Sequence, residues 1–374
     1  MAKNNWLFDL GGVDITSRVL SMNINSGRSK YLDSYSGGNV TFTINNSNDF
    51  ASSSMGYNQA IVLRTKVDNS EFYEWFWIRE ITYNDYPGNI GLNTATIVCS
   101  DWLTVSGYAY SNGRVIGSAT TAYQFNEFKD TRGGPLQGDL LVANIPSSTY
   151  CSGTTYFGSV LNYYNYLQAT ERGYLVNRIN TLYPISRDAL STYSPGTITL
   201  GRTTSATQIA YQSFERIRNG VQFINTATIN PAGLTSQTAS NFSIGSYGSS
   251  GFSQSTVDLT ETQALGNAQW IANNFNDPLS LRFTCTFTDV MQNATALTAF
   301  MQQIYGGTNR LITFNYQVPG GSPTTISCVI EGYQINATTE STQYLLYLSP
   351  LQYYQFFTLD STTLGILDTS RLGW

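Results

Sequence analysis

The chain has 374 residues and a mass of 41.3 kDa, enough for two or three domains with separate hydrophobic cores. Only 11% of the residues are charged and 14% are aromatic, so the composition is not that of a disordered linker. The net charge of −5 and the isoelectric point near 4.8 argue against a protein that grips nucleic-acid phosphates. The absence of histidine excludes Ser-His and Cys-His nucleophile pairs and histidine-ligated zinc or haem.

Lysine occurs at only four positions, Lys3, Lys30, Lys66 and Lys129, and the other basic residues are arginine. Lysine is strongly hydrated whereas arginine is common at interfaces, so this bias indicates a surface largely covered by partners. The apolar stretches are too short to span a membrane. Asp9 interrupts the start of the chain, where a signal peptide needs an apolar segment, so we expect synthesis in the cytoplasm without Sec export.

Alternation of apolar and polar residues begins in the first hundred residues and predicts half-buried strands. The apolar members of this pattern are Val40, Phe42, Ile44, Ala95, Ile97 and Cys99. The run 73–78, Tyr-Glu-Trp-Phe-Trp-Ile, departs from the alternation because it is bulky on both faces. It fits an inter-domain or inter-subunit contact or, equally well, a two-sided core.

Three segments have the spacing of helices laid on a sheet. The first contains Val160 to Leu167 and ends at 171–173, Glu-Arg-Gly. The second extends to Phe275 and is predicted to have Asp258 as its N-cap, with Glu261 at the third helical position. The third lies near 290–304 and stops at a Gly-Gly pair.

Alternation returns after residue 281 with a second set of apolar positions, namely Phe283, Cys285, Phe287, Ile312, Phe314, Tyr316, Ile326, Cys328 and Ile330. One apolar and one polar face is typical of antiparallel sheets or barrels. Stretches rich in Gly, Ser and Thr at 104–155 and 232–256 separate the β-rich parts. These patterns predict a mainly β, α+β protein, and the strands near the two ends are compatible with two copies of one barrel type.

The four cysteines, Cys99, Cys151, Cys285 and Cys328, are far apart and form no metal-binding motif. Three of them stand within strand patterns, so we expect small buried hydrophobes, with a Cys285–Cys328 bridge or a metal ligand as alternatives.

Few residues suggest chemistry, and we predict no catalytic residue, no cofactor-binding residue and no metal ligand. Three glycines, Gly245, Gly248 and Gly251, follow no recognisable parallel strand and open no recognisable helix, so they predict a flexible turn and not a phosphate cradle. The pairs Asp9/Asp14 and Asp360/Asp368 lack the dense oxygen-ligand loop that calcium prefers. Two carboxylates brought together by the fold would suffice for a glycosidase, so that activity stays an alternative.

Two segments of the sequence indicate a particular protein family more specifically than the overall composition does. The first runs from Asp14-Ile-Thr-Ser-Arg-Val through 26–33, Ser-Gly-Arg-Ser-Lys-Tyr-Leu-Asp, to 37–47, Gly-Gly-Asn-Val-Thr-Phe-Thr-Ile-Asn-Asn-Ser. It resembles the N-terminal barrel of phage minor tail or tail-tip hub proteins, which open with a "D-[VI]-T-S-x-V" strand, an "RGRS" turn and a "G-x-[AV]-T-[VF]-T-[LI]-x-N-S" strand. The second, 357–374, resembles the closing "LD…GVLD…LG" segment of the same family.

Less specific landmarks fall between these segments in the family's order, at 95–103, 161–176, 219–229, 243–248 and 329–333. The segment 76–81, Phe-Trp-Ile-Arg-Glu-Ile, departs from the family's usual "F-x-G-x-I". This departure leaves the register of the strand open.

The resemblance implies a structural virion protein without enzymatic activity or cofactor, a trimeric tail-tip or baseplate hub that joins a sixfold tail tube to a threefold tip. It implies two tail-tube-like antiparallel β-barrels with a peripheral α/β part and a C-terminal extension. The expected domains are barrel I at 1–105, a peripheral α+β domain at 106–205, barrel II at 206–353 with a helical insertion around 258–276, and a docking tail at 354–374.

The implied partners are two further copies of the chain, the tail tube or distal tail protein, the tape-measure protein, and tip, spike or fibre proteins. DNA would pass the hub only in transit during ejection. In the turn that resembles the family's, Arg28 is expected either to contact neighbouring subunits or to be solvated. The alternatives are a hexameric distal-tail ring or tube protein, a carbohydrate- or receptor-binding tail module, and a glycan hydrolase.

Overall fold

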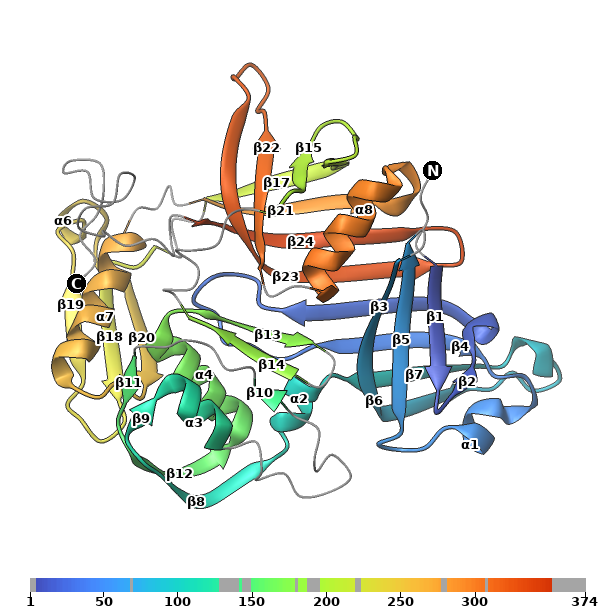
Figure 1. Cartoon of the computed structure of the whole chain (residues 1–374), viewed down its shortest axis with the longest axis horizontal. Coiled ribbons are helices and arrows are strands. Elements are labelled where there is room, and N and C mark those ends of the chain that lie inside the picture. The colour runs from blue at the N-terminus through green and yellow to red at the C-terminus, as the bar shows by residue number, and fades with distance from the viewer. Residues whose placement is uncertain are drawn as a thin grey trace.

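The structure is a computed structural model that describes residues 5–67, 70–127, 141–142, 149–178, 181–186, 196–218, 223–276, 281–306 and 309–351. Its largest element is a mostly antiparallel sheet of 14 strands, to which smaller sheets and helices are attached (Figure 1). The predicted mainly β, α+β class is confirmed. The predicted tail segment 354–374, including Asp360 and Asp368, lies outside the described residues.

The first β unit is formed by the strands before residue 101. Its strands are β1 (Asn5–Leu10), β2 (Val13–Asp14), β3 (Val19–Gly27), β4 (Asn39–Asn45), β5 (Ala60–Val67), β6 (Ser70–Asn84) and β7 (Thr94–Ser100). They follow one another in the order β3-β4-β7-β6-β5-β1-β2. Its short helices are η1 (Thr16–Arg18), η2 (Ser47–Asp49), α1 (Phe50–Ser54) and η3 (Ile90–Leu92).

The register of β4 and β7 confirms the predicted alternation. Val40 lies opposite Cys99, and Phe42 lies opposite Ile97. These side chains are buried, whereas the intervening threonines and asparagines are partly exposed. Period two therefore places the apolar residues of both strands on the same face, with the exception of Val98.

The bulky run 73–78 in β6 is a two-sided core within the chain. Phe76 and Ile78 belong to the apolar cluster of the first unit, whereas Trp77 belongs to a second cluster on the other face of the strand. An inter-subunit contact is therefore not needed to explain why this strand is apolar on both faces.

A β-bulge lies within segment 76–81, which departs from the "F-x-G-x-I" pattern. The pairing of β6 with β7 shifts register between Ile78 and Glu80, so Arg79 is the extra residue. A bulge accommodates one additional residue without reversing the faces of the rest of the strand.

The second β unit comes from the last third of the chain and from residues around 200. Its strands are β15 (Thr199–Gly201), β16 (Gln208–Ala210), β17 (Ser213–Arg218), β21 (Leu281–Thr288), β22 (Leu311–Tyr316), β23 (Thr324–Thr338) and β24 (Thr342–Pro350). Segment 208–218 pairs with β15 at its start and with β21 at its end. Pairing thus leads from β15 through β22, β23, β24 and β21 back to the same segment. Among the described residues of the first unit, β1 and β3 are not paired with each other. The strand pairing there does not lead back to its starting strand, as it does in the second unit.

The two units share one sheet and one core. β3 pairs with β23 from Gly27–Gly332 to Ser21–Thr338, and Figure 1 shows β4, β3, β23, β24 and β21 side by side. Helix α8 (Ala294–Met301), flanked by η4 (Asp289–Met291) and the π-helical η5 (Gln302–Gly306), covers this sheet. Its buried side chains join the apolar cluster that includes both units.

The peripheral part combines two stretches of sequence around a second apolar cluster. The first stretch forms α2 (Trp102–Ser106), β8 (Tyr110–Ile116), β9 (Ala119–Thr120), α3 (Thr121–Glu127), β10 (Leu141–Val142), β11 (Tyr150–Cys151), β12 (Thr154–Ser159), α4 (Val160–Glu171), β13 (Tyr174–Arg178) and β14 (Thr181–Ile185). The second forms β18 (Thr226–Pro231), β19 (Gln237–Ser240), α6 (Ile244–Tyr247), β20 (Gly251–Thr256) and α7 (Glu261–Asn274).

The two peripheral stretches are joined by direct backbone contacts. The Ser152 amide donates to the Val257 carbonyl at 3.0 Å, and Cys151 forms an isolated bridge with Asp258. The predicted helical insertion around 258–276 is therefore part of a larger insertion that also contains a three-stranded sheet. The domain boundaries themselves remain predictions.

The three predicted helices are present, but the cap of one was predicted wrongly. α4 and α8 lie within the expected segments. In α7 the N-cap is Thr260, whose hydroxyl accepts from the Gln263 amide at 3.1 Å. Asp258 instead lies buried, where it accepts hydrogen bonds from Thr256 and Asn267. The capping motif is therefore shifted by two residues, and the aspartate connects α7 to β20.

The glycines at 245, 248 and 251 lead from one regular element to the next. Gly245 lies within α6, Gly248 follows that helix with φ 78°, and Gly251 begins β20. The turn is confirmed at Gly248. The prediction that these glycines open no helix was wrong for Gly245, which lies in α6. A parallel strand pair is also present here, because β20, which begins at Gly251, runs parallel to β18.

All four cysteines are buried free thiols, as predicted, and Cys285 and Cys328 form no bridge. Burial raises the pKa of each thiol far above its usual range. We expect no reaction with a thiol reagent at pH 8 in the native protein, because the thiolate is the reacting species. In denaturant all four should react, and the two absorbance traces check this. A thiol that reacted rapidly in the native chain would contradict its burial.

Candidate functional site: a polar network between the β units

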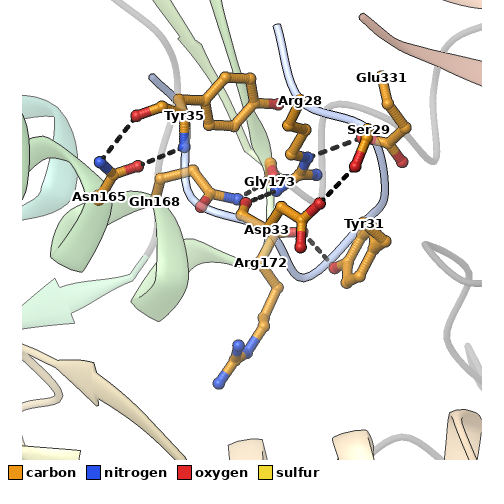
Figure 2. A network of polar contacts seen from close by, with 10 residues as sticks. All are labelled: Arg28, Ser29, Tyr31, Asp33, Tyr35, Asn165, Gln168, Arg172, Gly173 and Glu331. Carbon is orange, nitrogen blue, oxygen red and sulfur yellow. Dashed lines mark hydrogen bonds and ion pairs between the residues drawn. The ribbon is translucent and has the colours of Figure 1, made fainter. Parts of the chain in front are cut away.

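A buried polar contact joins the turn after β3 to the middle of β23. Arg28 Nε donates to Glu331 Oε2 at 2.8 Å, and the two side chains are 1% and 0% exposed (Figure 2). The Arg28 amide also donates to the Glu331 carbonyl at 3.0 Å. The two residues are 303 positions apart in sequence, so this pair ties the first β unit to the second.

A glycine allows the two strands to approach at this point. A Cβ on Gly332 would lie 2.5 Å from the Ser26 carbonyl oxygen, closer than any side chain can be placed. The motif Glu331-Gly332 thus supplies the anion and the space that the Arg28 turn requires.

The guanidinium of Arg28 also contacts the turn that carries it and the peripheral part. It lies over the rings of Tyr35, at 4.7 Å, and Tyr31, at 5.1 Å. Its two terminal nitrogens donate to the carbonyls of Asp33 at 3.4 Å and Gly173 at 3.5 Å. A buried arginine with a carboxylate partner, carbonyl acceptors and aromatic rings is held in one orientation.

The same turn is fastened to helix α4 by side chains. The Tyr31 hydroxyl donates to the Arg172 carbonyl at 2.9 Å. Asn165 accepts from the Tyr35 amide at 2.8 Å and donates to the Tyr35 carbonyl at 3.1 Å (Figure 2). Gln168 donates to the Gly173 carbonyl. Segment 28–38 therefore lies between the β units and the peripheral part and contacts both.

Arg172 extends the network to the second peripheral stretch. It ends α4 in the left-handed conformation, with φ 56°, and its side chain is buried. Nη1 donates to Gln254 at 2.6 Å and Nε to Asn267 at 3.3 Å. The carboxylate of Asp258, held by Asn267, lies near this arginine, and burial raises the pKa of Asp258.

Asp101 fastens the other end of the turn. It caps α2 by accepting from the Thr104 amide at 2.8 Å, and it accepts from Asn177 of β13 at 3.0 Å. Its own amide donates to the Gly38 carbonyl at 2.8 Å. Burial raises the pKa of Asp101, although these hydrogen bonds oppose that change. In this chain the segment 101–103, which resembles the "D-x-L" element, thus supplies a helix cap and a brace for the turn.

The expectation that Arg28 is solvated was wrong, because its side chain is buried within the chain. Contact of this turn with neighbouring subunits stays a prediction. Sequence reasoning also did not identify Glu331 as its partner. A charged residue inside an apolar strand was the available signal, because such a residue is seldom buried without an opposite charge.

The other acidic residues considered from sequence are used locally. Asp9 accepts from the Gly12 amide and pairs with Arg64 at 3.3 Å, and Asp14 accepts from the Thr16 amide. Within the described ranges, no three His, Cys, Asp or Glu residues are grouped as metal ligands. Within the same ranges, no helix has both the length and the hydropathy needed to cross a bilayer.

No protein-family model matches the sequence, and no curated protein sequence is similar to it. Solved structures are similar over most of the chain. A tail protein from Neisseria meningitidis has a TM-score of 0.63 at 11% identity, covering 92% of this chain and 96% of that one. The 43 kDa tail protein of prophage MuSo2 from Shewanella oneidensis has a TM-score of 0.60 at 12% identity, covering 93% and 98%.

A third similar structure is an E. coli component of the type VI secretion system, described as structurally similar to the T4 tail proteins gp27 and gp5. It has a TM-score of 0.51 at 9% identity, covering 92% of this chain and 76% of that one. The chain therefore has the fold of phage tail proteins and of a related secretion-system component.

Proposed function

We propose that the chain is a structural protein of a phage tail and that three copies form the tail-tip or baseplate hub. The observation that carries this proposal is the continuous sheet through two β units, in a fold shared with phage tail proteins over more than nine-tenths of the chain. Three chains with two β units each supply six, which matches a sixfold tube on one side and a threefold tip on the other.

The buried network supports a role in which the two β units keep a fixed arrangement. A hub that surrounds a channel must keep its two β units in fixed relative positions while the tape-measure protein and then DNA pass. The Arg28–Glu331 pair and the shared core oppose movement between the units, because separating them would break the ion pair with its hydrogen bonds and expose apolar surface.

The proposed partners follow from this position. They are two further copies of the chain, the tail tube or distal tail protein above, the tape-measure protein inside, and tip, spike or fibre proteins below. The proposed location is the virion tail, after synthesis in the host cytoplasm, and segment 354–374 is proposed as a docking tail. We assign no enzymatic activity, because Asp101, Asp258 and Glu331 all make structural hydrogen bonds.

The mass of the assembled chain tests the trimer. Light scattering should give about three times 41.3 kDa, and electron-microscope top views should look nearly sixfold, because each chain contributes two β units. A hexamer would contradict the hub and favour the distal-tail ring. A monomer that stays monomeric when mixed with purified tail tubes would contradict both.

A second candidate, a carbohydrate- or receptor-binding tail module, is favoured by an exposed aromatic group. Arg79 lies between the rings of Tyr57, at 5.7 Å, and Tyr108, at 5.2 Å, which are 69% and 71% exposed. Tyr110 and Phe157 are similarly exposed on the adjoining two-stranded sheet of β8 and β12. Rigid exposed rings are suited to stacking on sugar faces or protein side chains.

Replacing Tyr108 by alanine tests this second candidate. If the group binds glycans, Tyr108→Ala should weaken binding on a glycan array at least about fivefold, since a stacked aromatic ring contributes about 1 kcal/mol. Tyr83→Ala, on the distant end of β6, is the matched control because Tyr83 is also exposed. Equal binding by both variants, or none by the parent chain, would contradict the candidate.

A further inference from the structure

A groove of about 550 Å³ lies where the first β unit is left open. β1 and β3 are not paired with each other, and residues of both strands line the groove. Phe8 of β1, Met22 of β3 and Ala337 of β23 contribute buried apolar side chains to its lining. In the second β unit, by contrast, pairing of the described strands leads back to the starting segment.

The edge of β1 that borders the groove is unpaired near its start. Phe8 uses this edge, because its amide donates to Thr16 Oγ1 and its carbonyl accepts from the Ile15 amide, both at 2.8 Å. Backbone groups of a strand alternate between its two edges, so Trp6 presents its N–H and C=O on the same edge. No described strand pairs with that edge at Trp6, since β2 pairs only with the end of β1. An unpaired edge beside an apolar groove is a template for one more extended segment.

The mouth of the groove carries an exposed apolar side chain and a cation. Leu20 is the extra residue of a bulge where β3 pairs with β4, and its side chain is 45% exposed. Lys66 also lines the groove and is exposed, and no described carboxylate forms an ion pair with it. A segment that covers the groove should therefore be apolar and carry an acidic residue.

Segment 364–368, Leu-Gly-Ile-Leu-Asp, has this chemistry. Alternate residues of an extended segment share one side, so Leu364, Ile366 and Asp368 belong to the same side. The two apolar side chains match the apolar lining, and the carboxylate matches Lys66.

The chain between β24 and this segment is long enough to return to the groove. The Trp6 indole donates to Thr342 Oγ1 at 3.0 Å, so the groove lies beside the start of β24. β24 has nine residues, and its eight steps of about 3.3 Å place Pro350 about 26 Å from that start. About eight extended residues are needed to cover this distance in the opposite direction. Residues 352–363 supply twelve, which leaves about four for the change of direction.

We propose that segment 364–368 of the same chain occupies this groove and closes the first β unit. The inference rests on the proposed docking role of segment 354–374 and adds the site that receives it. Docking removes the apolar side chains of Leu364 and Ile366 from water, pairs the free edge at Trp6, and places Asp368 beside Lys66. The first unit then has no open edge at β1 with which another chain could pair.

A disulfide formed in the full-length chain tests this placement. Leu20→Cys lies at the mouth of the groove, and Ile366→Cys lies in the proposed occupant. Oxidation with copper–phenanthroline should join them within one chain at least about tenfold faster than it joins Val115→Cys to Ile366→Cys. Val115, on β8 of the peripheral part, is the matched control because it is 76% exposed. The native thiols are buried, and peptide mapping with a non-reducing gel identifies the product.

Two results would overturn the proposal. Equal rates for the two cysteine pairs would show that the segment does not dwell in the groove. A disulfide that joins two chains would show that the segment docks on a neighbouring copy instead. Neither result depends on the oligomeric state. A light-scattering mass of one chain overturns the trimeric hub, whereas rapid disulfide formation within that single chain still supports the docking, so the two failures are distinguishable.

Charge reversal tests the same occupant without introduced cysteines. Lys66→Glu or Asp368→Lys alone should speed hydrogen exchange in the β1 peptide that contains Trp6 by about two- to fivefold, the effect of one exposed ion pair. The double variant should restore the parent rate, because the opposite charges again face each other. Lys30→Glu, which changes a lysine in the turn after β3, is the control and should leave this exchange unchanged. Parent rates in both single variants, or no recovery in the double variant, would overturn the assignment of Asp368 to Lys66.

Discussion

Replacement of Arg28 by methionine should lower the free energy of unfolding by about 3–5 kcal/mol, measured by urea denaturation. The Arg28–Glu331 pair is almost completely buried, and methionine removes the cation that faces the carboxylate while keeping much of the side-chain volume. The same substitution removes the donors to the Asp33 and Gly173 carbonyls and the contact with Tyr35. The expected loss is therefore greater than a hydrogen bond alone would give.

Two comparisons make this prediction specific. Arg64→Met removes a cation that is 33% exposed and pairs with Asp9 and Glu71 on the surface, so it should cost less than about 1 kcal/mol. The double variant Arg28→Met with Glu331→Gln should recover a substantial part of the loss, because no buried charge then remains at the pair. Equal losses for Arg28→Met and Arg64→Met would show that the buried pair does not hold the β units together.

Replacement of Gly173 by alanine should destabilise the protein by at least about 3 kcal/mol, or prevent folding, because a Cβ there would overlap backbone. The added atom would lie 1.8 Å from the Ile185 carbonyl oxygen, so β13 and β14 would have to separate. The Gly173 carbonyl also accepts from Arg28 and Gln168, so the displacement would reach the polar network. Thermal unfolding followed by circular dichroism, together with soluble yield, measures this effect.

The matched control for this substitution is Gly245→Ala. Gly245 lies in the short helix α6, has no atom within 4 Å of the added Cβ, and does not require a positive φ. Alanine should be neutral or slightly stabilising at this site. Wild-type stability in Gly173→Ala would contradict the close packing of β13 against β14.

The elements themselves were predictable because their signals are local. Alternation in β4, β7 and β21 placed Phe42, Ile97 and Cys285 in the core correctly, since the period of a strand assigns each residue to one face. The helices α4 and α8 were found from their spacing and their glycine stops. The N-cap of α7 was misplaced because Asp258 and Thr260 are both acceptable caps, and tertiary hydrogen bonds to Thr256 and Asn267 use the aspartate elsewhere.

The sequence by itself determined the mainly β class, the buried free cysteines and the absence of histidine chemistry. Only the tertiary structure decided that β3 pairs with β23, that Arg28 meets Glu331, and that 226–274 packs with the peripheral part. The physical reason is that faces and caps depend on neighbouring residues, whereas strand pairing and ion pairing depend on which distant segments meet. Burial of a lone arginine and a lone glutamate each costs free energy, and only the fold brings the two together.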